Sequence, residues 1–176
     1  DDAGMKLIII GCSYRTAPVE LRERLAFPAD EQQQALKALV TIPDVEDALL
    51  LSTCNRVEVW ATTRRPEHAR REVAAFLSRS RGIPEEELAP CLFEYQEREA
   101  MVHLFRVTAS LDAMVVGEAQ IAGQVKEAFA TASRAGTLGT TLNRCMHKAL
   151  GASKRVRNET EIARHPVSIS SVAADM

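Results

Sequence analysis

The chain has 176 residues, of which 46% are hydrophobic and 26% are charged, and its formal net charge is −2. This balance is typical of a globular protein with one sizeable core or two small packed subdomains. It excludes a strong whole-molecule field that would draw the chain onto nucleic acid or an anionic membrane. No apolar run approaches the roughly 20 residues of a membrane-spanning helix, so we expect no membrane association.

The four cysteines are scattered along the chain, at positions 12, 54, 91 and 145. No two of them have the spacing of a Cys-x-x-Cys metal or redox motif, so we expect no metal site. Isolated cysteines fit a reducing cytoplasm better than a disulfide framework. Residues 1–4 lack the pattern of a signal peptide. We interpret them as residues added by cloning, with Met5 as the native start.

The first half of the chain predicts alternating strands and helices. The expected elements, in order, are a strand over 6–12, a short helix opened by Pro18, a helix with Asp30 as N-cap and Gln33 in capping-box position, strands over 48–51 and 57–61, a helix over 66–81 ended by Gly82, and a strand over 92–95. In the strand over 57–61, apolar residues alternate with Glu58, Trp60 and Thr62, which predicts two different faces. This order is the split β-α-β arrangement of a ferredoxin-like fold.

The second half of the chain predicts helices, around 101–107, 118–135 and 142–162, each with apolar residues at helical spacing. The expected fold class is therefore α+β. A ferredoxin-like sheet subdomain over 5–97 precedes a helical subdomain over 98–165, and the start of a long connecting helix occupies 166–176. Because that last helix stops abruptly, we expect the chain to be part of a longer protein.

A polar stretch, Ser52–Arg56, separates two predicted strands and contains Cys54. Cysteine attacks as the thiolate, and a nearby cation such as Arg56 favours that form or holds a carboxylate in a bidentate fork. Thr53 and Asn55 can hydrogen-bond a carbonyl or an ammonium group. The alternative is that Cys54 is a small hydrophobe packed near a turn, which is the usual role of an isolated cysteine.

Three further features leave two interpretations open. Glu118, Gln120 and Gln124 form a polar cluster at a predicted helix start, which is either capping and solvation or a substrate-facing surface. His103 lies in an apolar helix and is either a core residue or a base near a nucleophile. The last helix carries several Lys and Arg, which form either a solvated face or a contact to a phosphate backbone.

Four separated segments carry a more specific pattern. They are Gly11–Arg24 (GCSYRTAPVELRER), Ser52–Glu58 (STCNRVE), Leu111–Lys126 (LDAMVVGEAQIAGQVK) and Lys154–Thr160 (KRVRNET). In this order they resemble the N-terminal catalytic domain of the glutamyl-tRNA reductase family, over nearly the whole chain from Met5. The resemblance implies a reductase that converts the glutamyl group of glutamyl-tRNA to glutamate-1-semialdehyde with NADPH, in the five-carbon route to tetrapyrroles such as heme.

The resemblance also implies a role for each matching residue. Cys54 would attack the aminoacyl ester to give a glutamyl thioester, and His103 matches a histidine that is important for activity. The expected substrate contacts are Thr53, Asn55, Arg56, Glu118, Gln120, Gln124 and the position of Ala113. Arg56 suits the side-chain carboxylate of glutamate, and Glu118 suits its ammonium group.

Two departures from the family pattern affect this expectation. Ser110 and Ala113 stand where the family has glycine and a serine that touches substrate, so one hydrogen bond is lost and Ser110 adds a side chain that would crowd the pocket. Ser13, Tyr14 and Arg15 replace Asn-His-Lys. The alternative function is therefore a non-catalytic tRNA-binding or regulatory paralogue with an eroded pocket.

The chain lacks a strand followed by Gly-x-Gly-x-x-Gly and a helix, which is the pattern of a dinucleotide-binding domain. We therefore expect NADPH to bind elsewhere in the longer enzyme and not to this chain. The resemblance further implies a homodimer formed through a missing C-terminal domain, and the downstream aminomutase as a partner.

Overall fold

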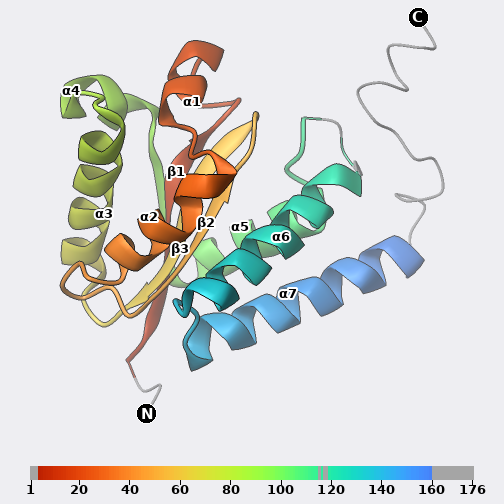
Figure 1. Ribbon diagram of the computed structural model, residues 1–176. Helices are drawn as coiled ribbons and strands as arrows, with labels where there is room; N and C mark the ends of the chain where they lie inside the picture. Colours follow the sequence, from red (N-terminus) through yellow and green to blue (C-terminus); the bar gives the residue numbers. More distant parts are fainter. Residues whose placement is uncertain (1–3, 115, 117–118, 160–176) are drawn as a thin grey trace, which may run out of the picture.

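Four antiparallel strands form a sheet in the order β2-β3-β1-β4. The strands are β1 (Lys6–Ser13), β2 (Asp47–Ser52), β3 (Arg56–Thr63) and β4 (Phe93–Gln96). The computed structural model describes residues 4–114, 116 and 119–159 (Figure 1). This strand order, with β1 and β3 in the centre, is the ferredoxin-like arrangement that the sequence predicts.

Helices connect and cover these strands. They are α1 (Val19–Leu25), a 3₁₀ turn (Ala29–Glu31), α2 (Gln32–Leu39), α3 (Pro66–Arg81), α4 (Glu85–Leu88), a second 3₁₀ turn (Ala89–Cys91), α5 (Glu97–Thr108), α6 (Ala119–Ala135) and α7 (Thr140–Glu159). Gly82 ends α3 in the left-handed conformation, with φ 64°, as expected. The capping box at Asp30 is wrong, because Asp30 lies inside the 3₁₀ turn and α2 starts without a side-chain cap.

Helices cover both faces of the sheet, so neither face is left open to solvent as a whole (Figure 1). α1 and α3 pack on the face that carries Cys12 and Val57, while α5, α6 and α7 pack on the face that carries Glu58 and Phe93. At the far end of the second face, the carboxylate of Asp47 accepts a hydrogen bond from the N–H of Leu142 at 3.2 Å. This contact joins the first turn of α7 to the start of β2.

β3 has two different faces, as the alternation along the strand predicts, and both faces are buried. All eight residues of this strand are buried, including Glu58 and Trp60, which are 0% exposed. Glu58, Trp60 and Thr62 lie on the face that α5–α7 cover. A carboxylate therefore lies in the interior of the molecule, where it needs a partner.

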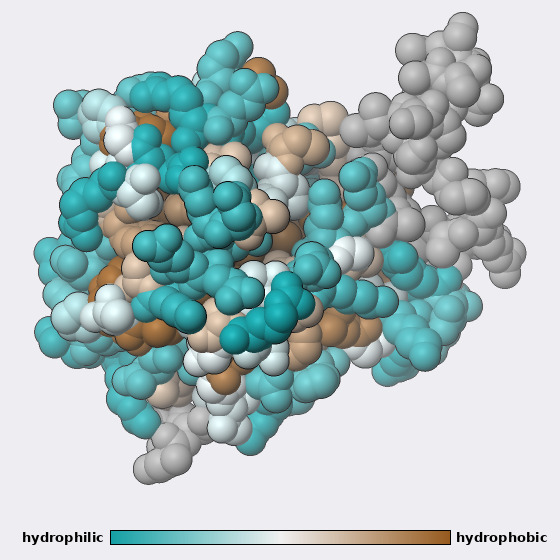
Figure 2. Space-filling model, viewed as in Figure 1, coloured by the Kyte–Doolittle hydropathy of each residue, from teal (hydrophilic) through white to brown (hydrophobic). Residues whose placement is uncertain are grey.

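The outer surface matches the composition, because hydrophilic side chains cover most of the face shown in Figure 2. Within the described ranges, no helix is both long and apolar enough to cross a membrane.

Candidate active site

The thiol of Cys54 lies at the tip of the turn between β2 and β3 and is exposed. The turn is closed by a hydrogen bond from the N–H of Thr53 to the carbonyl of Arg56 at 2.8 Å. The hydroxyl of Thr53 accepts hydrogen bonds from the N–H groups of Asn55 and Arg56, each at 3.2 Å. The N–H groups of Thr53, Asn55 and Arg56 are thus all bound within the turn, which fixes its conformation.

Two neighbouring segments fix this turn from outside. The N–H of Tyr14, just after β1, donates to the carbonyl of Asn55 at 2.8 Å. The guanidinium of Arg22, which is buried in α1, donates to the carbonyl of Cys54 at 3.3 Å and to that of Ala17 at 2.9 Å. The position of the thiol is therefore set by the backbone and does not depend on a flexible loop.

A small hollow of about 20 Å³ adjoins the thiol, and we call it the Cys54 hollow. Its lining contains seven of the predicted site residues, namely Thr53, Cys54, Asn55, Arg56, Ala113, Gln120 and Gln124, together with Met114 and Ile121. These residues come from the β2–β3 turn, the segment after α5, and the first turns of α6. The structure thus brings together polar residues that lie up to seventy positions apart. Glu118, the remaining predicted substrate contact, lies outside the described residues.

Arg56 is buried, with its side chain 1% exposed, and its guanidinium already has partners within the chain. Nη1 lies 3.2 Å from Oε2 of Glu58, and Nη2 donates to the backbone carbonyl of Asp112 and lies 3.3 Å from its carboxylate. The sequence predicts this guanidinium as a grip on a substrate carboxylate. In the structure, Asp112 holds the outer side of the guanidinium, where such a carboxylate would bind.

His103 does not line the Cys54 hollow. Its Nε2 contacts Oε1 of Glu58, and its ring packs against Phe93 and Tyr95 with centroid distances of 5.1 and 4.8 Å. Glu58 therefore joins His103 on one side to Arg56 on the other. His103 is mostly buried and its Nε2 has a partner, which fits the core alternative, and Glu58 and Arg56 lie between it and the Cys54 hollow. Its role as a base stays a prediction.

Gly11 makes room for this network. Gly11 lies opposite Glu58 on β3 and opposite Phe93 on β4. A Cβ atom at this position would lie 2.3 Å from the carbonyl oxygen of Val57 and 2.9 Å from Cγ of Glu58. The missing side chain thus allows Glu58 to lie close over β1, where it meets His103 from α5.

The two departures from the family pattern have different environments. Ala113 lines the Cys54 hollow, and its carbonyl accepts a hydrogen bond from the hydroxyl of Tyr14 at 3.3 Å. Ser110 does not line the hollow, so the predicted crowding is not observed. Ser110 is fully buried at a φ of 64°, and Nη2 of Arg157 donates to its hydroxyl at 3.1 Å. Glycine is the residue that reaches this left-handed conformation without steric cost, which explains the family pattern at this position.

The four cysteines differ sharply in environment. Cys12 is fully buried, and this burial raises the pKa of its thiol to about 11. Cys91 and Cys145 are half-buried, and Cys54 alone is exposed. Within the described part of the chain, no cluster of three or more His, Cys, Asp or Glu side chains could hold a metal ion. Cys54 is therefore the cysteine whose thiol a ligand from solution can reach most readily.

Four residues that contribute to this site were not predicted from the sequence. They are Glu58, Asp112, Gly11 and Arg22. Glu58 lies in the segment Ser52–Glu58. A carboxylate inside a strand of apolar residues is the signal that could have identified it. Asp112 offers no comparable signal, because its role depends on the tertiary contact with Arg56.

Fold and site together define an α+β domain that presents one cysteine on a rigid turn above a buried Arg–Glu–His network. The family model described as glutamyl-tRNAGlu reductase, N-terminal domain, matches residues 10–160. The chain is 45% identical over 172 residues to the glutamyl-tRNA reductase of Syntrophotalea carbinolica, and 44% identical to that of Geobacter sulfurreducens. Each alignment covers 98% of this chain, but only 39% and 40% of the two relatives.

A solved structure, that of glutamyl-tRNA reductase from Methanopyrus kandleri, is similar with a TM-score of 0.78 and 34% identity. The similarity covers 96% of this chain and 38% of the other. The chain belongs to the glutamyl-tRNA reductase family and corresponds to its N-terminal domain. It spans about two fifths of the length of the curated relatives it matches.

Proposed function

We propose that this chain carries the acyl-transfer step of a glutamyl-tRNA reductase, with Cys54 as the nucleophile. The observation that supports this role most strongly is the exposed thiol of Cys54, held on a hydrogen-bonded turn and adjoined by the hollow that seven predicted site residues line. The proposal also rests on membership of the family whose longer relatives are named glutamyl-tRNA reductase. Covalent catalysis divides a difficult reduction of an ester into two easier steps.

In the proposed step, the sulfur of Cys54 attacks the carbonyl carbon of the ester that joins glutamate to the terminal ribose of tRNA. A C–S bond forms, the C–O bond to the ribose breaks, and the thiol proton ends on the released ribose hydroxyl. The products are a glutamyl thioester on Cys54 and free tRNA. In the longer enzyme, NADPH would supply the hydride that releases glutamate-1-semialdehyde for tetrapyrrole synthesis in the cytoplasm.

The described residues suggest separate roles around the thiol. Gln120 and Gln124 reach the hollow from the start of α6 and offer amide groups to the polar atoms of the glutamyl group. Arg56 would bind the glutamate side-chain carboxylate in place of the Asp112 carboxylate, which lies 3.3 Å from Nη2. His103 would act as a positioning residue, because its contact with Glu58 holds the carboxylate that orients Arg56.

The domain division and the partners belong to the same proposal. Residues 5–97 would supply the nucleophile, and the helices that follow would complete the pocket. A homodimer built through another part of the longer protein, and an aminomutase that receives the aldehyde, follow from the family alone.

Mass spectrometry of the 176-residue chain after incubation with glutamyl-tRNA tests the acyl-transfer step. We expect a glutamyl adduct on the peptide that contains Cys54, and Cys54→Ser should lower its formation roughly 10³-fold or more. Cys91→Ser is the matched control and should form the adduct normally, because Cys91 lies in the 3₁₀ turn before β4. No adduct, together with ester hydrolysis that Cys54→Ser leaves unchanged, would refute the catalytic role.

A second function, tRNA binding without acyl transfer, has two observations in its favour. Ala113 contributes only a methyl group to the hollow, where the family serine would offer a hydroxyl. α7 also carries exposed basic side chains, including Lys148, Lys154 and Arg155, which suit contacts to phosphates. This alternative predicts salt-dependent tRNA binding and no adduct on Cys54, so the same experiment separates the two functions.

A further inference from the structure

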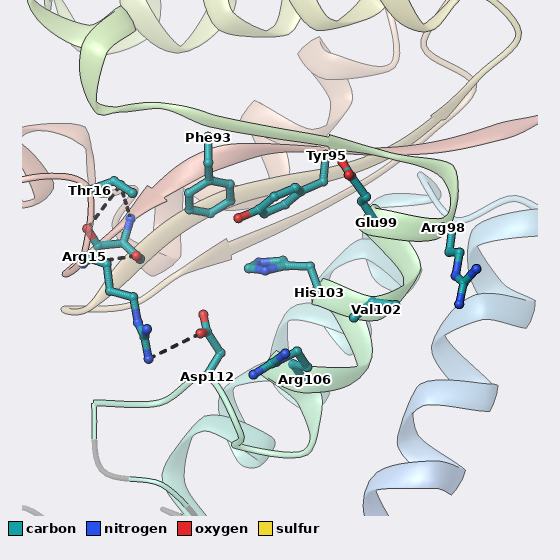
Figure 3. Close-up of a pocket in the computed structure, with 11 residues that line it drawn as sticks. Arg15, Thr16, Phe93, Tyr95, Arg98, Glu99, Val102, His103, Arg106 and Asp112 are labelled. Carbon is teal, nitrogen blue, oxygen red and sulfur yellow. Dashed lines mark hydrogen bonds and ion pairs between the residues drawn. The ribbon is translucent and has the colours of Figure 1, made fainter.

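The largest hollow near the candidate site is not the one beside Cys54. A groove of about 470 Å³ lies between β4 and α5, and we call it the α5 groove (Figure 3). Its volume is in the range of small-molecule sites, whereas the Cys54 hollow holds little more than a water molecule. The groove is therefore the place near Cys54 where a larger part of a substrate could lie.

Three aromatic rings form one wall of the α5 groove. Phe93 and Tyr95 occupy alternate positions of β4, so both rings point to the same side of the sheet, and their centroids are 5.2 Å apart at an interplanar angle of 28°. His103 comes from α5 and lies against both rings, as Figure 3 shows. All three side chains are partly exposed, so the wall offers ring surface on which a planar group can stack.

The opposite side of the groove carries three charged residues of α5, namely Arg98, Glu99 and Arg106. Arg98, Val102 and Arg106 are spaced four residues apart on α5, so they form one stripe along the helix. Arg98 and Arg106 are exposed, and neither side chain makes a hydrogen bond or ion pair with any described residue. Arg15 lies across the groove and contacts Asp112 at 3.7 Å. Two guanidinium groups are thus available for an anionic ligand.

The α5 groove and the Cys54 hollow share a wall. Asp112 lines the groove, Arg56 lines the hollow, and the two residues contact each other through the backbone carbonyl and the carboxylate of Asp112. A ligand that fills the groove is therefore placed next to the residues that surround the thiol. Three further cavities, lined by Arg71 and Leu92, by Ser52 and Thr131, and by Phe27 and Phe76, do not include Asp112 or His103 in their linings.

We propose that the α5 groove binds a nucleoside phosphate. The base stacks on the wall formed by Phe93, Tyr95 and His103, and the phosphate binds Arg98 and Arg106. A purely apolar ligand would leave the guanidinium groups unused, and a simple anion would leave the rings unused. Stacking on aromatic side chains beside cationic groups is the usual way in which proteins hold an unpaired nucleotide.

This inference rests on the proposed function, in which two molecules present a base with a phosphate. One is the 3′-terminal adenosine of glutamyl-tRNA, and the other is the nicotinamide mononucleotide half of the hydride donor. The chemistry of recognition is the same for both. Binding of adenosine 5′-monophosphate and of reduced nicotinamide mononucleotide, measured separately, distinguishes these sources.

The first experiment is calorimetric titration of the 176-residue chain with each nucleotide. We expect a dissociation constant of about 0.1–1 mM for the nucleotide that the groove accepts. Arg98→Gln and Arg106→Gln should each weaken binding about fivefold, and Tyr95→Leu about tenfold. Arg79→Gln is the matched control, because Arg79 is exposed on α3 and does not line the groove. No binding of either nucleotide at 5–10 mM, or equal weakening by Arg79→Gln, would overturn the proposal.

A second experiment separates the failure of this inference from the failure of the proposed function. Acylation of Cys54 is measured with glutamyl-tRNA and with a small glutamyl thioester that lacks a nucleotide. If the groove holds the terminal adenosine, Arg106→Gln raises the KM for glutamyl-tRNA about fivefold and leaves the reaction of the small thioester unchanged. Equal effects on both substrates would reject the groove as the adenosine site, whereas a missing adduct with both substrates in the parent chain would reject the role of Cys54.

Discussion

The Cys54 hollow and the α5 groove lie on either side of one contact, between Arg56 and Asp112, and they differ in almost every physical property. The hollow is small and sits beside an exposed thiol on a rigid turn. The groove is large, has an aromatic wall and carries unpaired guanidinium groups. The proposed reacting group therefore adjoins one cavity, whereas the space for a larger part of a substrate lies in the other. A site found through its nucleophile alone would overlook the larger cavity.

A buried ionic network separates the two cavities and connects them. Arg56 and Glu58 are 1% and 0% exposed, and each has a second charged or polar partner, Asp112 for Arg56 and His103 for Glu58. Burial of charges is tolerated only where every charge has a partner of good geometry. The network is therefore expected to be rigid, and changes within it should affect both cavities at once.

The largest expected effect comes from removing the wall between the cavities. Arg56→Met leaves the Glu58 carboxylate buried with His103 as its remaining partner. We expect the free energy of unfolding to fall by about 3–5 kcal/mol, because removing one partner of a buried ion pair leaves the other charge buried without that partner. Urea unfolding followed by circular dichroism measures this loss.

Two further variants make this prediction specific. Arg24→Met removes an exposed guanidinium that is paired with Glu87, and it should change stability little. The double variant Arg56→Met/Glu58→Leu should be more stable than Arg56→Met, since it removes the stranded carboxylate as well. If Arg56→Met lowers the free energy of unfolding no more than Arg24→Met does, the buried network between the two cavities does not stabilise the fold.

The next effect concerns the packing of Glu58 against β1. Gly11→Ala would place a Cβ atom 2.3 Å from the carbonyl oxygen of Val57 and 2.9 Å from Cγ of Glu58, so β3 has to shift. We expect a loss of about 3 kcal/mol, together with a changed environment of His103 in NMR spectra. Gly151→Ala is the control, because its Cβ atom would meet open space on α7.

Because alanine favours a helix interior over glycine, Gly151→Ala should raise stability by about 0.5–1 kcal/mol. A Gly11→Ala chain as stable as the parent would mean that Glu58 does not need the space above β1.

Most of the strands and helices that surround the two cavities could be predicted from the sequence. The order of β-branched runs and amphipathic helices predicts a ferredoxin-like sheet, and the observed strand order β2-β3-β1-β4 confirms it. The elements are local, and their periodicities are strong. Gly82 and Pro66 mark the ends of α3 in the sequence and in the structure.

The candidate site could be predicted only where a motif carried it. Cys54, Gln120 and Gln124 meet in one hollow, as the resemblance implied. The alternation along β3 places Glu58 on one face of the sheet but does not show what covers that face, and it is the packing of α5–α7 that buries Glu58. The contact between Arg56 and Asp112 likewise depends on the path of the chain after α5.

A third prediction contrasts the exposed thiol of Cys54 with the buried thiol of Cys12. Burial raises the pKa of Cys12 from 9.0 to about 11, so the folded chain holds this proton more tightly than the unfolded chain does. The raised pKa of Cys12 makes its full contribution to the stability of the folded chain below pH 9, and this contribution is lost as the pH rises towards 11. A shift of this size corresponds to about 2–3 kcal/mol.

The measurement compares the stability of the parent chain and of Cys12→Ala between pH 8 and pH 10.5. The parent should lose about 2 kcal/mol more than the variant over this range, since the variant lacks the titrating thiol. Cys54→Ala serves as the control and should follow the parent, because Cys54 is exposed in the turn. Parallel pH profiles for the parent and Cys12→Ala would show that this thiol is not held in its neutral form.

The smallest effect should be confined to the Cys54 hollow. Ala113→Ser adds a hydroxyl at a position that lines the hollow and lies beside the Arg56–Asp112 contact. One hydrogen bond to a substrate contributes about 0.5–1.5 kcal/mol, so acylation of Cys54 by glutamyl-tRNA should be about three- to tenfold faster. Ala152→Ser on α7 is the control and should leave the rate unchanged.

The same variant sharpens the contrast between the two cavities. Ala113 does not line the α5 groove, so Ala113→Ser should leave nucleotide binding there unchanged while it raises the rate at the thiol. A faster reaction with unchanged nucleotide affinity would assign chemistry to the hollow and binding to the groove. A change in both would mean that the Arg56–Asp112 contact moves as one unit and that the two cavities act as a single site.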